Sequence, residues 1–144
     1  GLQTEAEGPQ RKSVQLKPDA PLLHMNLGQT LIALDAPQPV AAGLVALTTA
    51  LAEENDNASA WRMLAEAYDK RGEEGMARLA TAEFQFNVGD LRQAREFAIR
   101  ARERLPKDSP EWRRATDIVL VSKPSKDDLK DLAKEGSISG AQVR

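Results

Sequence analysis

The sequence predicts an all-α fold, a solenoid of helical hairpins with about six main helices and a truncated helix at its N-terminal end. Apolar residues recur at intervals of three and four along successive segments, which is the spacing of one face of an α-helix. Proline and glycine fall between these segments rather than inside them. Only 4% of the 144 residues are aromatic, which favours closely packed helices over a β-sandwich or barrel.

The N-terminal third is expected to hold a partial helix and two complete ones. Residues 1–8 lack an apolar stripe and are expected to be disordered or a remnant of a longer chain. Residues 9–18 are expected to be the end of a truncated helix that stops at Pro18. One full helix then begins at Pro21, and another spans residues 40–53. Their expected core residues are Leu23, Leu27, Leu31 and Leu34 in the first, and Leu44, Leu47 and Leu51 in the second.

Two further helices are expected between residues 57 and 87. Asn57 is placed to cap the first of them, which continues to Arg71 and is closed by Gly72. The second spans residues 73–87, and Gly89 supplies the following turn. Their expected core positions are Trp61, Leu64, Ala65 and Tyr68 in the first, and Met76, Leu79, Ala80 and Phe84 in the second.

The last two main helices are expected near residues 91–104 and 110–121. Asp90 can cap the first, and Pro106 prevents its continuation. Ser109 and Pro110 form an N-cap followed by proline at the first helical position. The helical domain is thus expected to cover residues 9–122, followed by a polar, flexible tail over residues 123–144, where Ser125 caps at most a short, frayed helix.

The helices carry a repeated pattern that resembles the tetratricopeptide repeat (TPR). W-x-x-L-A-x-x-Y at residues 61–68, followed by Ala77, is similar to one repeat, and N-L-G-Q-T-L at residues 26–31 matches the same first-helix motif. His24 stands there in place of the large aromatic residue, so a packing role is expected for it. A second-helix pattern is visible in Ala94, Ala98, Ala101 and Pro106.

The spacing of the tryptophans departs from this repeat. Trp61 and Trp112 are 51 residues apart, which is one and a half repeats of about 34 residues. The helix at residues 73–87 is therefore expected to belong to two hairpins, and the regular array to break down beyond Gly72.

The order of short motifs from Pro9 to Val121 also resembles the C-terminal TPR region of bacterial periplasmic zinc metalloproteases, the BepA-like peptidases. These motifs include L-x-P-D-A-P-L-L, D-N-A-S-A-W-R, G-D-L-R-Q-A and S-P-E-W-x-R-A. The resemblance implies an upstream catalytic domain with a zinc-binding HExxH helix, none of which lies in this chain. It also implies a periplasmic or cell-envelope location and a protein-binding role that positions protease or substrate.

Composition excludes several kinds of site. The chain has no cysteine and one histidine, His24, so neither a zinc site nor a catalytic residue is expected, and no cofactor. Its net charge of −2 argues against nucleic-acid binding. No apolar run approaches the roughly 20 residues of a transmembrane helix. The expected partners are a protein or peptide and the upstream protease domain in cis.

Two surfaces are candidate binding sites. The first is a peptide groove formed by the first helices of the hairpins, with an apolar part and a charged part. Its residues are Leu22, Met25, Gln29, Ile32, Ser59, Arg62, Glu66, Asp69 and Lys70. Alternatively, Leu22 and Ile32 only pack against the preceding truncated helix.

The second surface is a basic patch made of Arg92, Arg95, Arg100, Arg104 and Arg113. Acidic residues are interleaved with it at helical spacing, as Glu96 is with Arg100, which favours a solvated face over a binding surface for an acidic partner. For the whole chain, the alternative to a protease module is a free-standing TPR adaptor or scaffold without a protease domain. A self-contained hydrolase is not expected.

Overall fold

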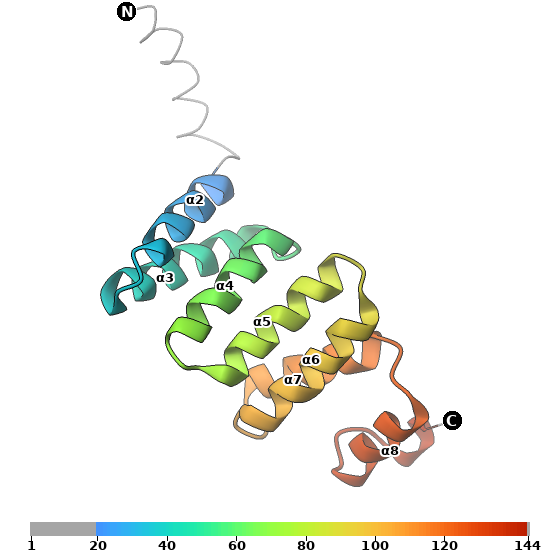
Figure 1. Cartoon of the computed structure of the whole chain (residues 1–144). Coiled ribbons are helices and arrows are strands. Elements are labelled where there is room, and N and C mark those ends of the chain that lie inside the picture. The colour runs from blue at the N-terminus through green and yellow to red at the C-terminus, as the bar shows by residue number, and fades with distance from the viewer. Residues whose placement is uncertain (1–19, 144) are drawn as a thin grey trace, which may run out of the picture.

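The computed structural model describes residues 20–143, which form seven α-helices and one short 3₁₀ helix (Figure 1). This part of the chain contains no β-strand. The truncated helix expected at residues 9–18 and the segment 1–8 lie outside it. The elements are α2 (Ala20–Ala33), α3 (Pro37–Glu53), α4 (Ala58–Lys70), α5 (Glu74–Asn87), α6 (Leu91–Arg104), α7 (Pro110–Val121), α8 (Lys126–Lys134) and η1 (Gly140–Gln142).

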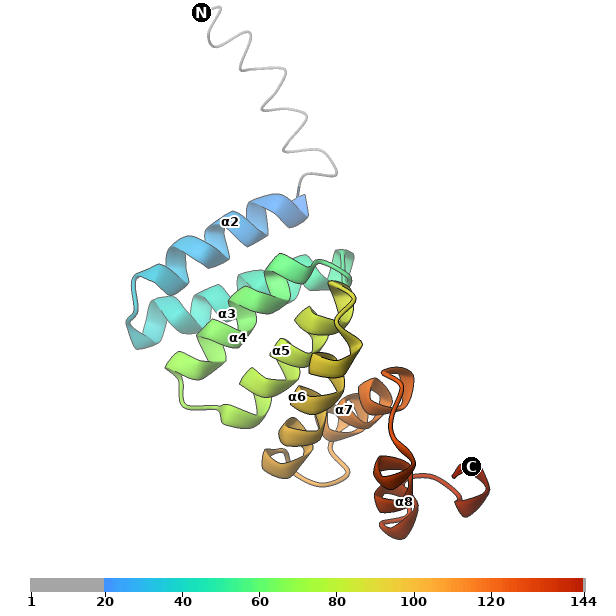
Figure 2. The ribbon, with the colours of Figure 1, turned by 45° about the vertical axis from the view of Figure 1, so that its right-hand side comes forward.

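From α2 to α7, helices that follow one another in the sequence pack side by side as hairpins, and α8 lies beyond the α6–α7 hairpin (Figures 1 and 2). The predicted all-α arrangement of helical hairpins is therefore confirmed. Short connections make this possible, because a turn of a few residues forces the next helix to run antiparallel to the last. The fourth of the predicted helices, α5, packs extensively on both α4 and α6, as expected for a helix that belongs to two hairpins.

The predicted helix starts are confirmed by side-chain caps. Asn57 accepts a hydrogen bond from the backbone N–H of Ala60 at 3.1 Å, and Asp90 and Ser109 cap α6 and α7 in the same way. Such a cap satisfies a backbone donor that has no partner within the helix. One boundary differs from expectation: α3 begins at Pro37 rather than at residue 40, because proline is well suited to the first turn.

Two glycines bring α2 and α3 unusually close together. A Cβ atom on Gly28 would lie 2.7 Å from Cγ of Leu47, and one on Gly43 would lie 2.8 Å from Cγ1 of Ile32. Neither position has room for a side chain, so the hairpin depends on both glycines.

The core consists of two clusters of buried side chains. The first lies mainly among α2, α3 and α4 and includes Leu44, Leu47, Leu51 and Leu64, as predicted. The second joins α5, α6 and α7 through small side chains such as Ala94, Ala98 and Ala101, together with Ile118 and Val119. Alanine at these positions lets the helix backbones approach closely, which explains why few aromatic residues are needed.

The leucine face predicted for the first helix is wrong. Leu23, Leu27 and Leu34 are 45%, 50% and 61% exposed. The inward face of α2 is instead formed by Pro21, Gly28 and Ile32. Because α2 contains apolar residues around most of its circumference, the spacing of its leucines did not identify the side that packs on α3.

The expectation of a loose tail after residue 122 is also wrong. Ser125 forms a complete capping box with Asp128 at the start of α8. Leu132 and Ile138 are buried in the second core cluster. The C-terminal segment is therefore docked on α6 and α7.

Candidate protein-binding groove

Two adjoining hollows run along the edges of α2, α4, α5 and α6. A hollow of about 160 Å³ lies between α2 and α4, and another of about 390 Å³ lies among α4, α5 and α6. Glu66 lines both, so the two hollows adjoin at this side chain, and together we call them the groove. Its lining residues are Gln29, Ile32, Ala33, Arg62, Met63, Ala65, Glu66, Asp69, Glu74, Ala77, Arg78, Thr81 and Phe97.

Five of the predicted groove residues converge on this depression: Gln29, Ile32, Arg62, Glu66 and Asp69. They come from faces of α2 and α4 that lie next to each other because the two helices are in direct contact. Ile32 is buried and forms part of the floor, whereas the four polar residues are exposed at the rim.

The other four predicted groove residues do not line either hollow. Leu22 is exposed outside them, and Ser59 is exposed near the start of α4. Met25 packs on the first core cluster, and its sulfur accepts a hydrogen bond from Nδ2 of Asn57. Lys70 is held by Asp35 at 3.1 Å, with Glu66 at 3.9 Å. Met25 and Lys70 therefore serve the fold of the hairpins rather than an open binding surface.

The sequence did not reveal the contributions of α5 and α6 to the groove. Phe97 is half-buried in the second hollow, and the guanidinium of Arg100 lies 5.6 Å from its ring centroid. Arg78 pairs with Glu74 at 2.9 Å along the same wall. A residue of α6 faces α4 only after α5 has folded between them, so no local signal could have identified Phe97.

The groove offers both charged and apolar contacts. Acidic Glu66, Asp69 and Glu74 and basic Arg62 and Arg78 lie around an apolar floor. Such a surface can bury small apolar side chains while its rim orients peptide groups by hydrogen bonds and charge. Among the described residues, no group of three or more His, Cys, Asp or Glu side chains is placed to hold a metal ion.

The predicted basic patch is dispersed. Arg95 donates hydrogen bonds to the backbone oxygens of Ser122 and Lys123, at 3.0 and 2.8 Å. Arg104 lies 3.6 Å from Glu74, and Arg92 lies 3.9 Å from Glu96. Arg113 is exposed on α7, and Arg100 is over Phe97. Two of these five arginines contact other elements, two contact residues of α6 itself, and one is exposed on α7, so they do not form one continuous cationic surface.

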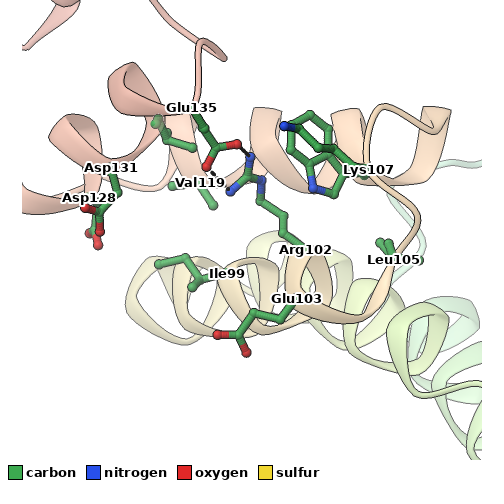
Figure 3. A pocket seen from close by; sticks show the side chains of 11 residues that line it. Ile99, Arg102, Glu103, Leu105, Lys107, Val119, Asp128, Asp131 and Glu135 are labelled. Atoms are coloured by element: carbon green, nitrogen blue, oxygen red, sulfur yellow. Dashed lines mark hydrogen bonds and ion pairs between the residues drawn. The ribbon is translucent and has the colours of Figure 1, made fainter.

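A larger hollow, of about 540 Å³, lies between α6, α7 and α8 (Figure 3). Arg102 reaches across it from α6 to Glu135, which follows α8, while Glu103 points away from this pair. The Arg102 side chain is 12% exposed, donates to Oγ1 of Thr116 at 2.7 Å and lies 4.3 Å from the ring centroid of Trp112. Arg102 therefore joins α6, α7 and the C-terminal segment.

The positive charge of Arg102 and the negative charge of Glu135 stabilise each other. The hydrogen bond from Arg102 holds the pKa of Glu135 below its ordinary value. Ser137 donates a second hydrogen bond to the same carboxylate, at 2.8 Å. Because Arg102 and Glu135 already bind each other and their neighbours, this hollow is interpreted as the contact that holds the C-terminal segment against α6 and α7.

A second ion pair joins α5 to α7. Glu83 is 4% exposed and accepts two hydrogen bonds from Arg114, at 2.7 and 2.8 Å. This hydrogen-bonded pairing raises the pKa of Arg114. A buried carboxylate needs such a partner, because an isolated charge is costly to remove from water.

The aromatic residues and the histidine mostly have packing roles. Trp112 is buried, while Trp61 is half-buried and donates from Nε1 to the backbone oxygen of Asn55 at 2.8 Å. Tyr68 packs on the first core cluster, and its partial burial raises its pKa. His24 is half-buried on α2.

Comparison of the chain with protein-family models, with curated proteins and with solved structures finds no match. Within residues 20–143, no helix is both long and apolar enough to cross a membrane.

Proposed function

We propose that this chain is a non-catalytic protein-binding module that takes an extended or helical peptide in the groove. One observation carries the proposal: the two hollows along α2, α4, α5 and α6 adjoin at Glu66 and combine an apolar floor with a charged rim. Pockets of this composition bind by excluding water from a few apolar side chains and orienting the ligand with polar groups.

The spacing of the helices supports assigning this module to the TPR class. The first residues of α4, α6 and α8 are Ala58, Leu91 and Lys126, so these helices recur at intervals close to the TPR period of about 34 residues. TPR arrays commonly expose one helix of each hairpin along an extended concave surface, and α2, α4 and α6 all contribute to the groove, together with α5.

The finer proposal is that the module is the C-terminal TPR domain of a periplasmic zinc metalloprotease, where it positions the protease or its substrate. Its support is the order of motifs that resemble the BepA-like peptidases. The reading frame that precedes this chain should then encode an HExxH helix. A preceding frame without HExxH would leave the alternative, a TPR adaptor without a protease domain.

Peptide selection tests the groove itself. Peptides selected from a random library on the wild-type chain should bind at least about tenfold more weakly to Arg62→Glu and Asp69→Lys, measured by fluorescence anisotropy. Both side chains are exposed, so circular dichroism should show an unchanged helix content. The matched control is Arg113→Glu on α7, which should bind normally. Equal binding by all of these variants would remove the groove from consideration.

A further inference from the structure

The α2–α3 hairpin differs from the rest of the chain because it is almost uncharged. Residues 20–53 contain only two charged side chains, Asp35 and Glu53, although 29% of the whole chain is charged. Water is nevertheless in contact with large apolar side chains on this hairpin. Leu23, Leu27 and Leu34, which we call the leucine stripe, are all about half exposed or more.

The leucine stripe is one continuous surface. Its residues lie within a narrow arc of the α2 circumference, because positions separated by four and seven residues fall on the same side of a helix. The opposite side of α2, formed by Pro21, Gly28 and Ile32, is buried against α3 and α4. The stripe therefore lies on the outer face of α2, on the side away from α3 and α4.

We propose that the leucine stripe is a homodimer interface in which α2 packs against α2 of a second copy of this chain. In a two-fold symmetric interface, each surface meets itself, so a charged patch would face like charge. A surface free of charge avoids that repulsion. Homodimer interfaces are also more apolar than other protein contacts.

Two other occupants fit the chemistry less well. Residues 9–19, which directly precede α2, contain only two large apolar residues, Val14 and Leu16, among four charged ones, so this segment offers little apolar surface to cover the stripe. A membrane surface would favour lysine and arginine beside the apolar face. Residues 20–53 contain neither.

The geometry also predicts how tight the dimer is. α2 has 14 residues and is therefore about 21 Å long. One pair of such helices buries less than the roughly 800 Å² per partner of a standard interface. The dimer is therefore expected to dissociate in the micromolar range.

Sedimentation equilibrium of the full chain, between about 1 μM and about 1 mM, tests the proposal. The wild type should dimerise, and Leu27→Asp should weaken the dimer at least about 100-fold, because each copy would bury a carboxylate at the interface. The matched control is Val88→Asp, since Val88 is 53% exposed at the end of α5 and lies outside the stripe. It should dimerise like the wild type.

A cysteine variant keeps the test independent of any folding defect. The chain has no cysteine, so Leu27→Cys introduces a single thiol. Mild oxidation should link Leu27→Cys chains into covalent dimers much faster than Val88→Cys chains. A wild-type chain that stays monomeric up to about 1 mM would overturn the proposal. This holds even if the chain binds lipid vesicles, or if it associates only after residues 1–18 are deleted. Dimerisation of Leu27→Asp at wild-type strength would also overturn it.

Discussion

The two ends of this molecule share one architecture but are held together by different interactions. The α2–α3 hairpin is joined by close backbone packing at Gly28 and Gly43 and has almost no charge. At the other end, Arg95 and Arg102 tie α6 to the segment that follows α7. Apolar packing contains no titrating group and is not weakened by charge screening, whereas these arginine contacts can be, so a change in pH or moderate salt should affect mainly the C-terminal end.

The largest predicted effects are the same at both ends, because both cores contain large, fully buried apolar side chains. Leu47 on α3 and Ile118 on α7 are both fully buried. Leu47→Ala and Ile118→Ala should each lower the free energy of unfolding by about 2 to 5 kcal/mol. Denaturant unfolding followed by circular dichroism measures this. A loss below about 1 kcal/mol for only one of them would show that one core is loosely packed.

The next largest loss of stability is expected at the contact between α5 and α7. Arg114→Ala leaves the carboxylate of Glu83 buried without its partner and should cost about 2 kcal/mol, less than for a fully buried pair because Arg114 is partly exposed. The neighbouring Arg113→Ala is the control and should change stability by less than about 0.5 kcal/mol. Equal effects of the two substitutions would mean that the Glu83–Arg114 pair does not stabilise the fold.

Acid should loosen the C-terminal end before the hairpin. Because the folded-state pKa of Glu135 is lowered, its contact with Arg102 stabilises docking fully above the unfolded pKa of about 4.3. That stabilisation is lost as the pH falls through the lower folded value. Fluorescence of Trp112, measured in a Trp61→Phe background, should report the change. Glu135→Gln should flatten this pH dependence, and an unchanged profile in that variant would assign it to another group.

The smallest effect is expected in the leucine stripe. Leu27→Gln should change the unfolding free energy of the monomer by less than about 0.5 kcal/mol, because half of Leu27 is already in water. Comparing this small effect with that of Leu47→Ala distinguishes the exposed face of the α2–α3 hairpin from its buried face. Measurements at low micromolar concentration keep self-association from contributing. A loss of unfolding free energy comparable to that of Leu47→Ala would show that Leu27 belongs to the core.

Sequence reasoning succeeded where the signal is local. Asn57, Asp90 and Ser109 were identified as caps because a cap depends on residues within one turn. The buried leucines of α3 were predicted because polar or small residues occupy its other face. In α2 the same method failed, since apolar side chains surround the helix and only the close approach at Gly28 reveals the inward side.

The remaining errors involve contacts between distant residues. Docking of α8 depends on Arg102 meeting Glu135, two residues far apart in the sequence, so the segment itself resembled a polar tail. The groove residues of α2 and α4 were predicted from the pattern of first helices. Phe97 and Arg78 were missed because they join the groove only through the packing of α5 between α4 and α6.

The position of α5 couples the two halves of the protein during unfolding. Its Ala80 belongs to the first core cluster, whereas Leu79 and Ala82 belong to the second. A linear array of helices can melt in stages, each governed by its contacts with its neighbours. Here both clusters lose packing if α5 unwinds, so this helix sets the cooperativity of the transition. Weakening α5 should turn one unfolding step into two.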